Sequence, residues 1–88
     1  MAAYVVQLKP AAERDLKKVK DQAILRRLVR AIDGLAINPR PSGVTRLQGD
    51  TAILRIRVGD YRIPYTVEDA AVLVLVIRVG HRRDVYRG

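Results

Sequence analysis

The chain has 88 residues, enough for one domain with a modest core, and its 17 lysines and arginines exceed its 9 acidic residues to give a formal net charge of +8. It contains no cysteine and one histidine, which excludes disulfides and thiolate chemistry and argues against a zinc site. Its longest apolar run, from Ala70 to Ile77, is much shorter than the roughly 20 residues that a membrane helix needs. We therefore expect a single soluble, cytoplasmic domain over residues 1–88 whose partners are polyanions: nucleic acid, an anionic membrane surface or an acidic protein.

The first half of the chain predicts a strand followed by two helices. Tyr4–Leu8 is rich in β-prone residues, and Pro10 suits the first position of a helix, where an N–H would have no partner anyway. Apolar residues at helical spacing predict a second helix over residues 22–37: Ile24, Leu25, Leu28, Val29, Ile32, Leu35 and Ala36. We expect both helices to cover one face of a sheet, with Arg26, Arg27 and Arg30 on the solvated side.

A β-hairpin is the clearest local prediction in the second half. Residues alternate between apolar and polar over Ile53–Val58 and again over Tyr61–Val67. Gly59-Asp60 between the two runs suits a two-residue turn that needs positive φ at its first central position. Such a turn fixes the register, and it places the apolar residues of both strands on one face.

The same register gathers arginines on the other face of the hairpin. Arg57 lies directly opposite Arg62, and Arg55 is two residues along the same strand. Like charges opposed in a sheet cost a few tenths to about 1 kcal/mol, whereas guanidinium groups on two neighbouring strands can bind phosphate or carboxylate groups together. The arrangement therefore indicates either an anion-binding site or a set of arginines that simply extend into water.

The last third of the chain predicts a buried strand and a basic tail. Val72–Val79 has almost no polar alternation, so we expect it to lie centrally and to be covered on both faces. Pro64 lacks an N–H for the preceding strand, which predicts a bulge or a missing hydrogen bond there. The order β-α-α-β-β-β indicates an α+β fold, an antiparallel sheet with a two-helix hairpin packed on one face. The tail follows directly with His81, Arg82, Arg83 and Tyr86.

Two segments together resemble the RelE branch of the RelE/ParE superfamily of type II toxin-antitoxin toxins. One is the hairpin, with Arg55, Arg57 and then Gly59-Asp60-Tyr61-Arg62; the other runs from Val76 to Tyr86 and includes Gly80-His81-Arg82-Arg83. The opening of the first helix, Pro10 to Leu16, is similar too. The resemblance covers nearly the whole chain and implies a microbial-ribonuclease type of fold, with an activity that cuts messenger RNA in the ribosomal A site.

The resemblance also implies a set of site residues and partners. The catalytic positions of this branch map to Arg55, Arg57, Arg62, Arg82 and Tyr86, and Arg78 and Arg83 are further candidates for RNA binding. The implied partners are a cognate antitoxin, with which such toxins form larger complexes, together with the ribosome and its messenger; no cofactor, metal or membrane is implied. In the best-described member the first basic pair is lysine, so Arg55 and Arg57 depart from it.

The proton transfers are the open part of this interpretation. Cleavage by the RNA's own 2′-hydroxyl requires alignment, cationic stabilisation of the phosphorane and proton transfer at both ends. Arginines suit the second task and not the third, because they stay protonated. His81 is the best acid or base by chemistry, although it could equally be a strand-end residue that packs. Two other classes remain: a ParE-like inhibitor of DNA gyrase, and a relative that only binds RNA or an acidic protein.

Overall fold

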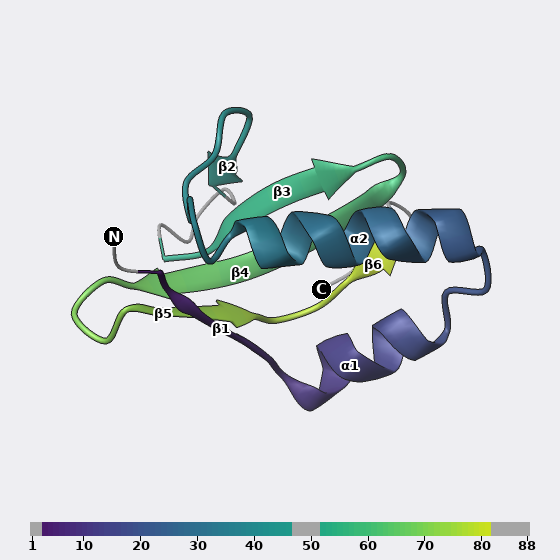
Figure 1. Cartoon of the computed structure of the whole chain (residues 1–88), viewed down its shortest axis with the longest axis horizontal. Coiled ribbons are helices and arrows are strands. Elements are labelled where there is room, and N and C mark those ends of the chain that lie inside the picture. The colour runs from purple at the N-terminus through teal and green to yellow at the C-terminus, as the bar shows by residue number, and fades with distance from the viewer. Residues whose placement is uncertain (1–2, 47–51, 82–88) are drawn as a thin grey trace.

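The computed structural model describes residues 3–46 and 52–81. Two helices lie on one side of a sheet, and α2 crosses over β3 and β4 (Figure 1). The strands follow the order β1-β5-β4-β3-β2, and β6 pairs with β4 beyond the end of β5. The predicted α+β class is confirmed by these elements: β1 (Val5–Leu8), α1 (Pro10–Lys17), α2 (Gln22–Gly34), β2 (Thr45–Arg46), β3 (Leu54–Val58), β4 (Tyr61–Glu68), β5 (Leu73–Val76) and β6 (Gly80–His81).

Local signals set the bounds of both helices. Pro10 opens α1, as its fixed φ predicts. Asp21 caps α2, because its carboxylate accepts the N–H groups of Ala23 at 2.9 Å and Ile24 at 3.2 Å. α2 was expected to reach residue 37 but ends at Gly34, after which residues 35–37 form a tighter turn with hydrogen bonds to the third residue back. Glycine is the weakest helix former after proline, which accounts for the early end.

The hairpin has the predicted register. Leu54 pairs with Tyr65, Ile56 with Ile63, and Val58 with Tyr61. Gly59 has a φ of +59°, and Asp60 does not have a positive φ, so the turn needs glycine only at its first central position, as expected.

Two glycines should respond in opposite directions to alanine. Gly59→Ala is expected to lower the free energy of unfolding by about 1–2 kcal/mol, because the left-handed conformation brings a Cβ close to the next carbonyl oxygen. Gly34→Ala is expected to raise it by about 0.5–1 kcal/mol, since Gly34 is helical and a Cβ there would have no neighbour within 4 Å. Urea unfolding of both variants measures the difference, and equal signs would contradict the conformational explanation.

One aspect of the predicted sheet is wrong: the sheet is mixed, because β1 pairs with β5 in parallel. Val5 lies opposite Leu73 and Leu8 opposite Val76. Parallel neighbours need a long connection between them, and the helices, the hairpin and their loops supply it. The β-prone residues of Tyr4–Leu8 indicated a strand but carried no information about its direction.

The predicted strand at Val72–Val79 is divided by a bulge. Tyr65 pairs with Val76, whereas Arg62 pairs with Gly80, so two residues of β4 face the three residues Ile77–Val79. The carbonyl of Pro64 accepts the Ile77 N–H at 2.9 Å, so the side of Pro64 that lacks an N–H faces this bulge. The β3–β4 ladder on the other side of Pro64 continues undisturbed. Proline at this position therefore accounts for both the bulge and the intact hairpin.

The helices bury one face of the sheet. The core joins Ala12, Leu28, Ile32 and Leu35 of the helical side to Leu54, Ile63, Tyr65, Val74, Val76 and Val79 of the sheet side. Leu73 and Leu75 of β5 point to the other face and are only half-buried, so the expected burial of this strand on both faces holds for one face alone. The uncovered face is therefore where side chains of β3, β4 and β5 remain accessible.

Tyr65 holds the loop after α2 against the sheet. Its side chain is fully buried, and its hydroxyl donates to the carbonyl oxygen of Pro39 at 2.7 Å. Burial raises the pKa of Tyr65 to about 12, although the nearby Arg40 charge acts in the opposite direction. The hydroxyl is therefore a neutral donor at physiological pH, and the loop over residues 38–43 is fixed beside β3.

Candidate functional site

The uncovered face of the hairpin carries three arginines. Arg55 and Arg57 alternate with the core residues of β3, and Arg62 does the same on β4. Arg57 lies directly opposite Arg62, as the register predicted. Arg57 is exposed, whereas Arg55 and Arg62 are half-buried. We call Arg55, Arg57 and Arg62 the arginine face.

Arg57 and Arg62 form the kind of antiparallel pair in which the opposite side chains lie closer together. The two-residue turn makes Val58 and Tyr61 a hydrogen-bonded pair, so the next pair, Arg57 and Arg62, is not hydrogen-bonded and brings its side chains nearer together. On the other side of β4, Arg62 pairs with Gly80 of β6. Because Gly80 has no side chain, the Arg62 side chain can lie directly over the backbone of β6. The Nη1 atom of Arg62 is inaccessible to solvent. Two arginines thus start from directly opposite positions on neighbouring strands, an arrangement that suits an anion bound between their side chains.

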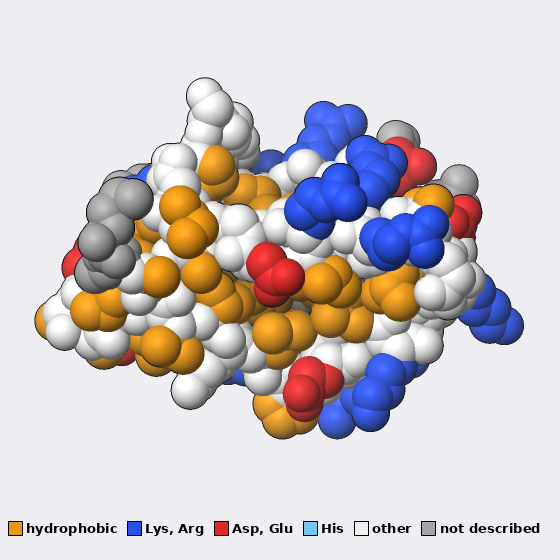
Figure 2. Space-filling model, viewed as in Figure 1, with side chains coloured by type: hydrophobic (Ala, Val, Ile, Leu, Met, Phe, Trp, Pro, Cys, Tyr) orange, Lys and Arg blue, Asp and Glu red, His pale blue; other side chains and the backbone are white. Residues whose placement is uncertain are grey.

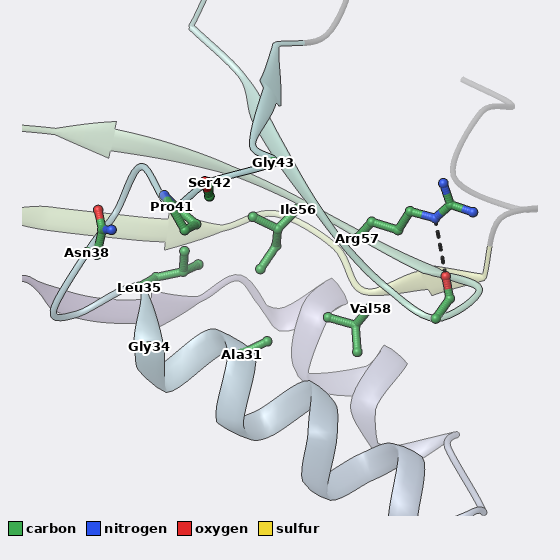
Figure 3. Close-up of a pocket in the computed structure, with 11 residues that line it drawn as sticks. Ala31, Gly34, Leu35, Asn38, Pro41, Ser42, Gly43, Ile56, Arg57 and Val58 are labelled. Atoms are coloured by element: carbon green, nitrogen blue, oxygen red, sulfur yellow. Dashed lines mark hydrogen bonds between the residues drawn. The ribbon is translucent and has the colours of Figure 1, made fainter.

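Arg57 borders a groove between α2 and β3. The groove has a volume of about 700 Å³, and its apolar lining comes from Ala31, Leu35, Pro41, Ile56 and Val58. In Figure 3, Ile56 and Val58 point toward α2, whereas the Arg57 side chain extends away from the groove along the hairpin. Its Nε lies 3.5 Å from the carbonyl oxygen of Gly59, which is too long for a bond that fixes the guanidinium. Arg57 is therefore able to reorient toward a ligand.

His81 lies on the opposite face from the arginines. It pairs with Tyr61, whose side chain belongs to the helix-covered face, and the two rings meet edge to face with centroids 5.5 Å apart. Both residues line a pocket of about 300 Å³ together with Asp15 and Lys18 of the α1 side. The structure therefore places the histidine on the other side of the hairpin from the arginine face, and its acid or base role stays a prediction.

Arg78 is engaged by an acidic residue of α1. Its Nε and Nη2 atoms donate to the two carboxylate oxygens of Asp15 at 2.8 Å and 3.1 Å. Asp15 also accepts the N–H of Val79 at 2.9 Å. The predicted role of Arg78 in RNA binding is untested, but these contacts give its guanidinium a structural partner. The sequence analysis missed Asp15, whose only signal was its place in the Pro10–Leu16 opening.

The remaining site residues of the tail lie outside the described residues: Arg82, Arg83 and Tyr86. The described part ends at His81 in β6, which is hydrogen-bonded to the start of β4, next to Arg62. Within residues 3–46 and 52–81, no three His, Cys, Asp or Glu side chains gather where they could hold a metal ion. In the same part of the chain, no helix is long and apolar enough to cross a membrane.

A second basic surface lies on the helical side. Arg26, Arg27 and Arg30 are exposed on α2, and Figure 2 shows Lys and Arg side chains gathered over this helix. Arg26 and Arg30 are one turn apart, where like charges repel by a few tenths of a kcal/mol. The molecule therefore presents cationic groups on both of its broad faces.

The comparisons with known proteins agree with this architecture. A family profile described as the ParE toxin of type II toxin-antitoxin systems, parDE, matches residues 6–86. Toxin RelG of Mycobacterium tuberculosis is 30% identical over 84 residues, which cover 96% of this chain and 97% of RelG. The toxin-antitoxin complex RelBE2 of the same organism contains a chain with a TM-score of 0.80 and 31% identity, over 96% of this chain and 97% of that one. The isolated E. coli RelE toxin has a TM-score of 0.76 and 26% identity, over 90% and 84% of the two chains.

A layer of two helices on a mixed sheet is thus shared with toxins of the RelE type. The chain belongs to the ParE toxin family of type II toxin-antitoxin systems. Its similarity to RelG and to RelE confirms the resemblance to the RelE branch that the sequence indicated.

Proposed function

We propose that this toxin is an endoribonuclease that cuts messenger RNA in the ribosomal A site by attack of the 2′-hydroxyl. The observation that carries the proposal is the close opposition of Arg57 and Arg62 on the uncovered face, with Arg55 beside them. Guanidinium groups on two adjacent strands suit an RNA phosphate, whose negative charge rises as it becomes a phosphorane. Like charges directly opposed in a sheet repel each other, and a phosphate bound between them would offset that repulsion.

The chemistry needs neither a covalent enzyme intermediate nor a protein nucleophile. The 2′-oxygen attacks phosphorus and loses its proton, while the 5′-oxygen leaves and gains one, so the products are a 2′,3′-cyclic phosphate and a 5′-hydroxyl. Arg55, Arg57, Arg62 and Arg82 would stabilise the phosphorane, and Tyr86 would stack on a base or bond the phosphate. His81 lines a pocket on the helix-covered side, and it stays a candidate for proton transfer together with groups of the ribosome.

The charge distribution supports dependence on the ribosome. The messenger would meet the arginine face, while Arg26, Arg27 and Arg30 on the opposite side would meet ribosomal RNA. A single strand cannot engage both faces at once, whereas the ribosome offers separate RNA segments. The sparse acid-base chemistry of the chain agrees with a substrate that the ribosome orients.

A cognate antitoxin is the second partner. The RelBE2 structure is a toxin-antitoxin complex, and by this likeness we assign such a partner here. An acidic or amphipathic antitoxin segment on the arginine face would neutralise the opposed charges and exclude RNA. The apolar groove between α2 and β3 lies on the helix-covered side of the hairpin, so it would take a separate part of the antitoxin.

The test is to express the chain without antitoxin and to map the 5′ ends of cellular messengers. Cuts in phase with codons are expected, together with an arrest of translation. The double variant Arg62→Ala with Arg82→Ala should abolish both effects. Efficient cleavage of free messenger by the purified protein would argue against ribosome dependence.

The family description gives reason to keep a second candidate, a ParE-like inhibitor of DNA gyrase. Such an inhibitor would need no arginine face, because it makes no phosphorane. If the same double variant still stops growth while translation continues normally, the gyrase alternative replaces the nuclease.

A further inference from the structure

The carboxylate of Asp15 joins α1 to the segment that crosses the bulge between β5 and β6. It accepts three donors from that segment, two from the Arg78 guanidinium and one from the Val79 N–H, at 2.8–3.1 Å. We infer that Asp15 is a positioning residue that fixes the crossing segment, Ile77–Val79, and thereby sets the position of Gly80 and His81, which directly precede Arg82 in the sequence.

The crossing segment needs such a support because the sheet does not supply one. Ile77 donates to the Pro64 carbonyl, and the next ladder pair is Gly80 with Arg62. Between them, Val79 donates to Asp15 instead of to β4. A buried backbone N–H requires a partner, and Val79 is 2% exposed. The Asp15 carboxylate thus accepts the hydrogen bond that a carbonyl of the neighbouring strand would accept if the bulge did not interrupt the ladder.

Asp15 is equipped to remain charged in this place. Its side chain is only 10% exposed, and burial by itself would raise the pKa of the carboxyl. The Arg78 guanidinium, the Val79 N–H and the charge of Lys18 outweigh that effect and hold the pKa below its usual value. The carboxylate therefore keeps its full strength as an acceptor at neutral pH.

What Asp15 positions is the residue pair that follows. Gly80 lies opposite Arg62 and His81 opposite Tyr61, and the chain continues from His81 directly into Arg82. On the proposed function, Arg82 must approach the same phosphate as Arg62. A shift of the crossing segment by about 1 Å is enough to reduce an aligned reaction by roughly 100-fold. Asp15 acts through this alignment and does not contact the RNA.

The chain offers a matched control at the other end of β4. Asp69 also accepts three donors, from Nη1 and Nη2 of Arg40 at 3.2 Å and 3.0 Å and from the Tyr4 hydroxyl at 2.6 Å. It follows the last residue of β4, whereas His81 pairs with the first. Asp69→Asn therefore removes a carboxylate with the same number of donors, 58% exposed where Asp15 is 10% exposed, without affecting the crossing segment.

Amide hydrogen exchange tests whether Asp15 fixes the crossing segment, and it does not rely on activity. In Asp15→Asn, exchange at Val79 and Gly80 should be about tenfold faster or more, since a bond to a charged acceptor is lost. Exchange at Leu28, in the core of α2, reports global unfolding and should change much less. Asp69→Asn should leave Val79 and Gly80 as in the wild type. An equal acceleration at all three amides in Asp15→Asn, or none at Val79, would overturn the inference.

Kinetics on ribosomes programmed with a synthetic messenger test the positioning role. Asp15→Asn should lower kcat by about 10- to 100-fold with KM within about threefold, and Asp69→Asn should lower neither. Arg78→Lys keeps the positive charge and the bond from Val79 to Asp15 but loses the bidentate contact. We therefore expect an intermediate loss of kcat, and this variant remains informative if Asp15→Asn folds poorly. Faster exchange at Val79 with an unchanged kcat would refute the positioning role. If the wild type cuts no messenger, the proposed nuclease fails, and the exchange experiment alone decides whether Asp15 is the anchor.

Discussion

Arg62→Gln is expected to lower the rate of messenger cleavage on the ribosome by about 100- to 1,000-fold, because one of the charges that stabilise the phosphorane is removed. Arg62 is the central member of the arginine face, opposite Arg57 on one side and Gly80 on the other. Glutamine keeps a polar side chain of similar length but has no positive charge. Single-turnover cleavage of a messenger bound to ribosomes is the appropriate measurement.

The control for this change is Arg26→Gln, which removes the same charge from the exposed side of α2. It should leave the single-turnover rate at saturating ribosomes close to that of the wild type. Its effect should appear instead as weaker, more salt-dependent binding to ribosomes. Equal losses of the single-turnover rate in both variants would mean that overall charge, rather than the arginine face, sustains the activity.

Leu28→Ala is expected to lower the free energy of unfolding by about 2–5 kcal/mol. Leu28 is 0% exposed and packs from α2 into the core over the sheet, so truncation leaves a cavity that the rigid layers cannot close. A loss of this size is a large fraction of the stability of a small domain. Urea unfolding followed by circular dichroism measures it.

The neighbouring Val29 provides the comparison. It lies on the same helix but is 41% exposed, so Val29→Ala should change the free energy of unfolding by about 0.5 kcal/mol or less. Similar losses for both substitutions would show that helix propensity, and not burial under the sheet, determines the stability of α2.

The hairpin was the most predictable part of the fold. Its register follows from a period of two and from a glycine at a position that needs positive φ, and both signals are local. The opposition of Arg57 and Arg62 is a direct consequence of that register. The helix starts were likewise marked by Pro10 and by the apolar spacing that follows Asp21.

The features that the sequence did not reveal depend on contacts between distant residues. The direction of β1 is set by its pairing with β5, 68 residues away for Val5 and Leu73. The placement of His81 on the helical side results from the bulge at Ile77–Val79. Pro64 predicted a bulge or a missing hydrogen bond, but it did not show that the extra residue would lie in the strand after β5. Asp15 looked like an ordinary helix residue, because its partners Arg78 and Val79 come from the far end of the chain.

The pairing of β1 with β5 has a consequence for synthesis of the toxin. Val6 and Leu8 leave the ribosome early, but the strand that receives them, with the fully buried Val74 and Val76, is made near the end. A nascent or truncated chain that stops before Val76 cannot complete the sheet, and incomplete domains of this kind remain open to proteases. A partial product that lacks β5 is therefore expected to be degraded faster than a chain that contains it.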